Sequence, residues 1–315
     1  MSSSSLASGG IGVGESVCYL CLDGDSDDDG QPLRRDCACR GTDAGFVHLA
    51  CLTKYAEIKS TQASGMEEFR DPWRECPSCH QIYQNELAVD IATEFVPFVR
   101  RQYPDDTERL VEALHVKLRA LDSMLVRLQP RQKREFGVTA NVLLSLIGRM
   151  KGDVSLLPRR YSHMEAYAHN AHGCIALDEG TEESARRAVA HFENDLKVSK
   201  AIGDDESIAT AKANIAYAKS MNEGDSNIEK VLKASQELYE MRVAKYGEGN
   251  EYTITGGKIH ARRLQDANRE EEARELLTKL LAKSKQVLGS HHNITKEVES
   301  ALEHVVSKCE VANQE

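Results

Sequence analysis

Three short stretches near the N-terminus decide the fold: CYLC at residues 18–21, CACRGTDAGFVHLAC at residues 37–51 and CPSC at residues 76–79. They hold eight potential metal ligands in four close pairs: Cys18 and Cys21, Cys37 and Cys39, His48 and Cys51, and Cys76 and Cys79. Zinc prefers four tetrahedral nitrogen or sulfur ligands, and two ligands close in sequence can approach one ion from a single turn. Eight ligands complete two sites and leave no position open for a catalytic water. We therefore expect two structural zinc ions.

The distribution of cysteines supports metal binding. Seven of the nine cysteines lie within the first 79 residues. In a reducing compartment such a local cluster binds metal more often than it forms disulfides. A segment of about 65 residues that is poor in large apolar side chains cannot sustain a core alone. Structural zinc supplies about 10–16 kcal/mol of binding free energy coupled to folding, so we expect the loss of one ligand to unfold this segment.

The ligand order, four Cys, one His and three Cys with a single residue between Cys37 and Cys39, resembles the RING-CH (RING-variant) family. The resemblance covers about residues 17–83 and extends to further residues: Cys39-Arg40-Gly41-Thr42, Phe46 to Leu52, and Trp73 before the last pair. It implies a small zinc-stabilised α+β domain of the RING type, in which the two sites interleave as a cross-brace. Cys18, Cys21, His48 and Cys51 would hold one ion, and Cys37, Cys39, Cys76 and Cys79 the other. The sequence departs from the family pattern in a stretch between Cys39 and His48 that is one residue longer, and in Tyr55, where Trp is common.

The same resemblance implies a ubiquitin ligase. Such a domain recruits a ubiquitin-conjugating enzyme and orients its thioester-linked ubiquitin, so it acts by positioning and supplies no catalytic acid or base. The partner-binding residues carried over are Leu20, Trp73 and Pro77, although Leu20 and Trp73 could instead pack the small core. The alternative is a non-catalytic zinc-binding scaffold or a PHD-like peptide reader. The single residue between Cys37 and Cys39 favours the RING-CH interpretation.

The second part of the chain indicates a helical repeat. No proline follows Pro158, and glycines recur in Ile202-Gly203-Asp204, Tyr246-Gly247-Glu248 and Leu288-Gly289-Ser290, at intervals of 44 and 42 residues. Between them, tight turns are expected at residues 178–180, 222–224 and 266–268. These features, with the Leu-Gly-x-x-His-x-x-Thr signature at residues 288–295, resemble the tetratricopeptide (TPR) family of the kinesin-light-chain type. The fold class we expect is therefore a zinc-stabilised RING-type domain followed by an all-α TPR-like repeat domain.

Small residues recur at matching places in these repeats. Gly173, Ala216 and Ala261 each precede the start of a turn by five or six residues, and Ala185 and Ala273 follow two of the turns. Small side chains on both helices of a pair allow their backbones to approach closely. Glu229 stands at the corresponding place in the middle repeat, so the packing of that repeat is expected to differ.

We divide the chain into a flexible tail (1–16), the RING-CH zinc finger (17–88), a helical linker (89–135) and the TPR-like repeats (136–310). Within the linker, leucines spaced by three and four residues predict an amphipathic helix over 107–128 that ends before Pro130. It either bridges the two domains or begins the helical array.

The net charge of −10 argues against a general nucleic-acid partner, because phosphate contacts need clustered Lys and Arg. No apolar run reaches the ~18 residues of a membrane span, and no signal peptide is recognised. We therefore expect a cytoplasmic or nuclear protein whose repeats bind a protein substrate or adaptor.

A second group of metal-ligating residue types occurs later in the chain. His169, His172 and Cys174 lie close together on an expected helix. The two histidines have no matching ligand pair elsewhere in the sequence, so helix packing is the favoured interpretation.

Overall fold

The structure, a computed structural model, describes residues 16–24, 30, 32–37, 39, 45–153, 158–223, 227–290 and 292–312. Residues 1–15 of the expected tail, and residues 40–44 of the stretch that departs from the family spacing, lie outside this described part.

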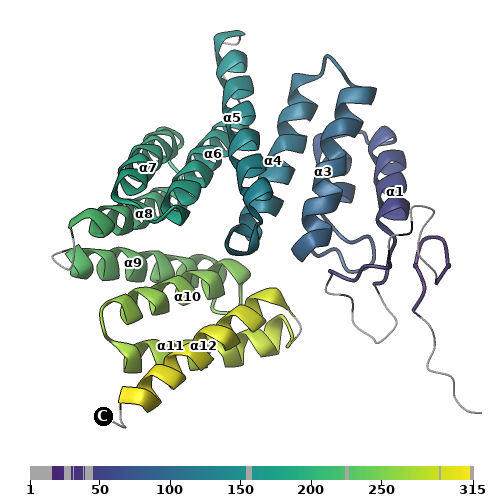
Figure 1. The fold of residues 1–315 in the computed structure, drawn as a ribbon. Helices are drawn as coiled ribbons and strands as arrows, with labels where there is room; N and C mark the ends of the chain where they lie inside the picture. The colour runs from purple at the N-terminus through teal and green to yellow at the C-terminus, as the bar shows by residue number, and fades with distance from the viewer. Residues whose placement is uncertain are drawn as a thin grey trace, which may run out of the picture. The chain divides into compact units, whose positions relative to one another are not determined.

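Helices dominate the described residues (Figure 1). In chain order they are α1 (Leu49–Thr61), α2 (Met66–Arg70), the 3-10 turn η1 (Asp71–Trp73), α3 (Asn85–Gln102), α4 (Thr107–Ser123), the 3-10 turn η2 (Leu125–Arg127), α5 (Pro130–Asp153), α6 (Arg159–Asp178), α7 (Glu182–Ile202), α8 (Asp205–Glu223), α9 (Ile228–Tyr246), α10 (Glu251–Asp266), α11 (Glu270–Val287) and α12 (Asn293–Ala312). None of these helices combines the length and the apolar character that a membrane crossing requires.

The chain forms two compact units, Met1–Glu94 and Phe95–Glu315. The boundary falls inside α3, so one continuous helix belongs to both units. The first unit contains the expected zinc finger and the second contains the helical array.

The first unit is built from loops, short helices and two isolated antiparallel β-bridges. Arg34 pairs with Val47, and Glu75 pairs with Ile82. In the part of this unit that the structure describes, the β component of the expected α+β fold is limited to these bridges. A small core of buried apolar side chains lies beside them: Val47, Leu52, Ala56, Phe69 and Trp73.

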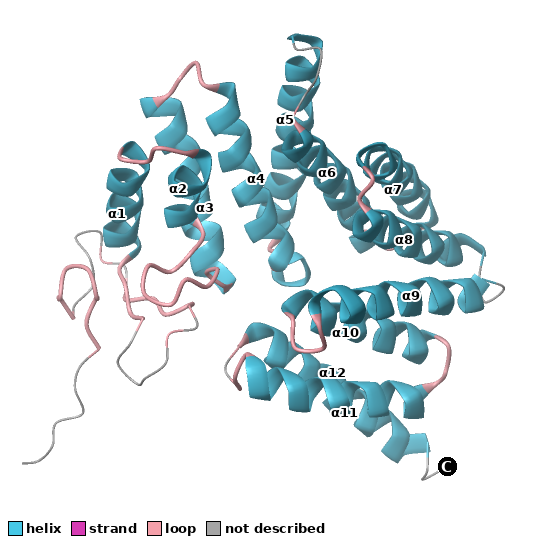
Figure 2. Cartoon of the chain, turned by 180° about the vertical axis from the view of Figure 1, so that it is seen from behind, coloured by secondary structure: helices cyan, strands magenta, loops and turns pink. Residues whose placement is uncertain are grey.

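The second unit is an array of helical hairpins (Figure 2). Each helix from α4 to α12 packs on the next one along the chain, and α4 also contacts α6, α6 contacts α8, and α10 contacts α12. The predicted helix 107–128 is found as α4 and η2, and it ends before Pro130 as expected. Because α4 packs against α5 and α6, this helix begins the array. The array therefore begins one helix before the predicted repeat segment, which starts at residue 136 within α5.

The recurrent glycines lie at the turns between hairpins. Gly203, Gly247 and Gly289 have φ angles of 64°, 81° and 93°. A side chain with a Cβ is disfavoured in this left-handed region, whereas glycine enters it without steric cost. The periodic glycines therefore end one hairpin and redirect the chain into the next, as the repeat interpretation predicts.

The small residues allow the paired helices to approach closely. At Gly173 the approach leaves no space for a side chain. A Cβ on Gly173 of α6 would lie 2.3 Å from the ring of Phe192 on α7. Ala185 and Ala273, each the fourth residue of its helix, are fully buried. In α9 the fourth residue is Val231, which is also buried, while Glu229 is exposed. In the middle hairpin the second helix thus begins two residues later after its turn than in the other two hairpins. Val231, not Glu229, therefore lies at the position that packs between the two helices.

Candidate metal centre

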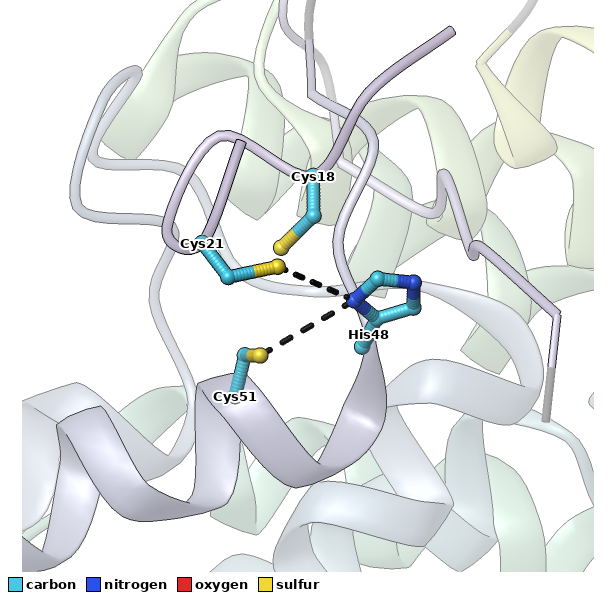
Figure 3. Close-up of side chains that lie close together, drawn as sticks. All are labelled: Cys18, Cys21, His48 and Cys51. Atoms are coloured by element: carbon cyan, nitrogen blue, oxygen red, sulfur yellow. Dashed lines mark hydrogen bonds between the residues drawn. The ribbon is translucent and has the colours of Figure 1, made fainter. Parts of the chain in front are cut away.

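The first cluster gathers Cys18, Cys21, His48 and Cys51 from two separate segments. Their ligand atoms lie within 4.8 Å of one another. Figure 3 shows the three sulfurs and the Nδ1 atom of His48 turned toward one another. Nδ1 lies 3.4 Å from the Cys21 sulfur and 3.8 Å from the Cys51 sulfur. Cys18 and His48 are buried, so the interior of the cluster is shielded from solvent.

The second cluster gathers four sulfurs, those of Cys37, Cys39, Cys76 and Cys79. These atoms also lie within 4.8 Å of one another, with 3.6 Å between the sulfurs of Cys39 and Cys76. Cys76 is buried and the other three cysteines are half-buried. The structure therefore brings together all eight predicted ligands in the two groups that the family resemblance implies.

The separations fit tetrahedral zinc. With Zn–S bonds of about 2.3 Å and Zn–N bonds of about 2.0–2.1 Å, tetrahedral geometry places two sulfurs about 3.8 Å apart, and a sulfur and a nitrogen about 3.6 Å apart. The observed distances of 3.4, 3.6 and 3.8 Å lie close to these values. One site offers three sulfurs and one imidazole nitrogen, and the other four sulfurs, both of which are donor sets of structural zinc.

The two Cys-x2-Cys turns share one backbone pattern. The amide of Cys18 donates to the carbonyl of Asp23 at 2.8 Å, and the amide of Leu22 donates to the carbonyl of Cys18 at 2.8 Å. In the second turn, Cys76 donates to Gln81 at 2.9 Å and His80 donates to Cys76 at 2.9 Å.

A left-handed residue closes each of these turns. Leu22 has φ = 66° and His80 has φ = 55°, and each is the fourth residue after the first cysteine of its pair. The same local fold thus presents two sulfurs to each ion.

Backbone amides in these turns stabilise the first thiolate. Burial raises the pKa of Cys18, but amide hydrogen bonds from Cys21, His48 and Leu20 outweigh it and lower the pKa to about 7. In the other turn the Cys37 thiol lowers the pKa of Cys76 to about 4, with help from the amides of Cys79 and Ser78. Each turn is therefore preorganised to hold a negatively charged sulfur.

Three other thiols, those of Cys37, Cys39 and Cys51, resist ionisation when no cation is present. Burial, followed by the neighbouring sulfurs, raises the pKa of Cys39 to about 11 and that of Cys51 to about 12. The pKa of Cys37 is raised because its thiol is hydrogen-bonded to the Cys76 thiolate. Several thiolates within 4.8 Å of one another repel, so each cluster needs a cation to ionise fully. A divalent zinc ion supplies the missing charge.

Local structure places the middle ligands. Arg34 and Val47 exchange backbone hydrogen bonds of 2.8 and 2.9 Å, which sets His48 at the N-terminus of α1, with Cys51 in the first turn of that helix. The segment before Cys37 is held to α3, because Arg34 pairs with Asp90 at 2.9 Å and Asp36 accepts a hydrogen bond from Asn85 at 2.9 Å. Secondary structure therefore positions Asp36, next to Cys37, and His48.

Gly45 is a site residue that sequence reasoning missed. Its φ angle is 83°, and a Cβ there would lie 2.9 Å from the Cys37 sulfur and 3.0 Å from the Cys39 Cβ. Only glycine allows the chain to pass so close to the second cluster in this conformation. The nearest sequence signal was its position three residues before His48.

The three predicted partner-binding residues have different surroundings. Leu20 and Pro77 are half-buried within the two Cys-x2-Cys turns. Trp73 is fully buried, and its indole N–H donates a hydrogen bond to the Ser60 hydroxyl. In this structure Trp73 therefore packs the core of the domain and contributes no surface of its own. This burial agrees with the core-packing alternative for Trp73; the sequence position of a residue gives no information on its depth.

The family model described as "RING-variant domain" matches residues 18–79, the segment that carries all eight ligands. Residues 18–79 form a RING-variant domain. Its two clusters of cysteine and histidine agree with two bound zinc ions. No curated protein matches the chain.

Two solved structures that match the chain are crystal structures of the nearly identical TPR-like repeats of a putative kinesin light chain from Podosopora anserina. Both are 12% identical to this chain and cover 76% of it and 95% of their own length, with TM-scores of 0.40 and 0.38. The TPR-like character of the region after the RING-variant domain rests on its own helical hairpins and glycine turns.

Proposed function

We propose that this chain is a RING-type ubiquitin ligase, in which the RING-variant domain binds a ubiquitin-conjugating enzyme and the helical repeats bind a protein substrate or adaptor. The observation that carries the proposal is the pair of four-ligand clusters inside the RING-variant match at residues 18–79. Two closed zinc sites leave no position for metal-based catalysis. The domain then acts by holding a charged conjugating enzyme in a reactive orientation.

The docking surface in this proposal lies on the two Cys-x2-Cys turns. Leu20 and Pro77 are its central residues. Exposed apolar side chains flank the turns: Val17 and Leu22 beside the first, and Ile82 beside the second. Leu22 is 75% exposed. A large apolar side chain that is exposed to this extent adds nothing to the stability of the isolated domain. Trp73 is fully buried in the core of the domain and is not part of this surface.

The repeat region supplies the second half of the proposal. Stacked hairpins present one row of helices along a continuous surface that suits protein recognition. On this unit Tyr252 and Ile259, seven residues apart on α10, are exposed, as is Tyr246 at the end of α9. Covalent linkage of a recognition module to the ligase module raises the effective concentration of the target near the thioester. The net charge of −10 favours protein partners over nucleic acid.

The thiols of both clusters must stay reduced to bind zinc. We therefore place the protein in the cytoplasm or the nucleus, where thiols are kept reduced. The cysteines that the structure describes form no disulfides, which agrees with this placement.

The test is a discharge assay with purified full-length protein, ubiquitin, activating enzyme, ATP and a panel of conjugating enzymes. Leu20→Ala and Pro77→Ala are expected to lower the rate of discharge at least ~10-fold, the effect of losing a central apolar contact of an interface. Val138→Ala is the matched control, because Val138 is equally apolar and 55% exposed but lies on α5. All three variants should retain two zinc ions per chain.

Absence of discharge with every conjugating enzyme, in protein that retains both ions, would refute the ligase proposal. Binding of a histone-tail peptide by that same protein would instead support the PHD-like peptide reader.

A further inference from the structure

Three histidines meet in the hairpin formed by α6 and α7. His169 and His172 lie on α6 and His191 lies on α7. The rings of His172 and His191 are stacked, with centroids 4.8 Å apart and an angle of 19° between the planes. The ring of His169 lies 6.2 Å from that of His191. The sequence indicated two members of this cluster but gave no sign of the third, which is 19 residues further along the chain.

Each ring keeps one nitrogen away from solvent and from any hydrogen-bond partner. These atoms are Nδ1 of His169, Nε2 of His172 and Nδ1 of His191. A neutral imidazole tolerates one unpaired acceptor nitrogen, but the protonated ring carries an N–H donor on both nitrogens. A buried charged donor without an acceptor is costly. The stacked arrangement therefore suits neutral rings.

The surrounding charges do not compensate for protonation. The charged groups acting on the cluster are Lys151 of α5, Glu165 of α6 and Arg187 of α7. Two of these are cations, and the one carboxylate, that of Glu165, is already paired with Lys151. Burial is the main cause that lowers the pKa of all three histidines, and it lowers that of His172 to about 4.

We propose that this three-histidine cluster makes the α6–α7 hairpin acid-labile, so that acidification opens this hairpin before the rest of the repeat array. The rings cannot accept protons while they stay stacked and unpaired, and separation of α6 from α7 hydrates them. A cavity of about 290 Å³ beside His169, lined by residues of α5, α6 and α7, gives water an approach to the cluster. The cluster is then a proton-sensitive element at the start of the proposed recognition surface.

The sign of the effect follows from linkage. The open hairpin binds protons below the ordinary histidine pKa of 6.5, while the closed hairpin excludes them from His172 until about pH 4. The contribution of the cluster to the free energy of opening the α6–α7 hairpin is therefore fully present above pH 6.5, and it is lost as the pH falls toward 4. Asp195 of α7 acts in the opposite direction, because burial raises its pKa to about 6. Proton uptake by Asp195 in the closed hairpin therefore offsets about one of the three protons that the histidines take up when the hairpin opens.

Peptide-resolved hydrogen exchange on the full chain tests this inference. Between pH 7.5 and pH 5.5, after correction for intrinsic exchange rates, we expect the protection of α6 and α7 amides to fall at least ~10-fold, since each linked histidine contributes about tenfold per pH unit. The hairpin α8–α9 contains no histidine and is the internal reference. The double variant His172→Phe/His191→Phe retains stacked aromatic rings and should lose at least ~10-fold of the acid effect. His304→Phe, at an exposed position of α12, should behave as the wild type.

An equal fall in protection for α6–α7 and α8–α9 would overturn the proposal, as would an unchanged acid effect in the double variant. A second measurement on the wild type does not depend on folding of any variant. In a histidine NMR titration, the three clustered rings should stay neutral at pH 5.5. Titration of all of them together near pH 6.5 would refute the inference.

Discussion

The indole Nε1 of Trp73 donates a hydrogen bond of 2.7 Å to the hydroxyl oxygen of Ser60, which itself donates to the carbonyl of Phe69 at 2.7 Å. All three residues are buried. This chain of hydrogen bonds connects η1 with α1 and α2, and it satisfies the one polar atom of the only tryptophan in the sequence. The core of the RING-variant domain is therefore organised around Trp73.

Trp73→Ala should destabilise the domain by about 3–5 kcal/mol, because it leaves a large cavity in a small core. Zinc retention and ubiquitin discharge should then fall together. Trp73→Phe retains most of the packing and should cost less, with about 0.5–1.5 kcal/mol for the lost hydrogen bond to Ser60, whose hydroxyl still donates to Phe69. Thermal unfolding and zinc release with a chromogenic chelator measure both effects. Full stability with selective loss of discharge would show that Trp73 acts at the surface instead.

Gly45→Ala should disrupt the second zinc site. The added methyl group would overlap the Cys37 sulfur at 2.9 Å, and the φ angle of 83° is unfavourable for alanine. We expect fewer than two zinc ions per chain by elemental analysis. Gly65→Ala is the control, because a methyl group added there would meet no atom within 4 Å and the φ angle of Gly65 is −145°. Normal zinc content in Gly45→Ala would contradict the close approach of Gly45 to Cys37 and Cys39.

Cys76→Ser should abolish binding of the second ion and unfold the RING-variant domain, since structural zinc supplies about 10–16 kcal/mol of folding free energy. Native mass spectrometry and circular dichroism would follow metal content and folding. Cys174→Ser is the matched control, because Cys174 lies in α6 and belongs to neither cluster. That variant should keep two ions, and a loss of zinc from it would point to a different ligand set.

Gly173→Ala should destabilise the repeat array by about 1–3 kcal/mol through overpacking against Phe192. The second substitution Phe192→Leu should recover part of this loss, because it removes the ring that the methyl group meets. Gly137→Ala in α5 has its nearest neighbour at 3.8 Å and should instead stabilise the helix by up to about 1 kcal/mol. Urea unfolding of the wild type, Gly173→Ala, Phe192→Leu, the double variant and Gly137→Ala compares these effects. Additive losses in the double variant would contradict the close contact.

The metal ligands could be predicted because their chemistry is local. In a reducing compartment, cysteines and histidines paired at short spacing are typical of zinc sites, and the turns of the repeat are similarly encoded by periodic glycines. Gly45 could not be predicted in this way. Its role depends on how closely the chain passes two sulfurs, and a distance of that kind exists only after folding.

The same limit explains the other differences. The burial of Trp73 is set by the helices that surround it, so its position beside the last cysteine pair says nothing of its depth. The sequence pattern predicts a disturbance at Glu229 because the pattern counts residues from the turn. Packing depends instead on the position within the helix, and the fourth residue of α9 is the buried Val231. His191 joins His172 only because α7 folds back on α6.

The alternation of the two ligand sets along the chain has a consequence for how the domain matures. One ion joins residues 18–21 to 48–51, and the other joins 37–39 to 76–79, so each closed loop contains a ligand pair that belongs to its neighbour. The first ion to bind therefore closes a loop that contains one ligand pair of the second site. This closure lowers the conformational entropy that the chain must still lose when the second ion binds. Under metal scarcity the population should divide into empty and doubly loaded chains, with few that carry a single ion.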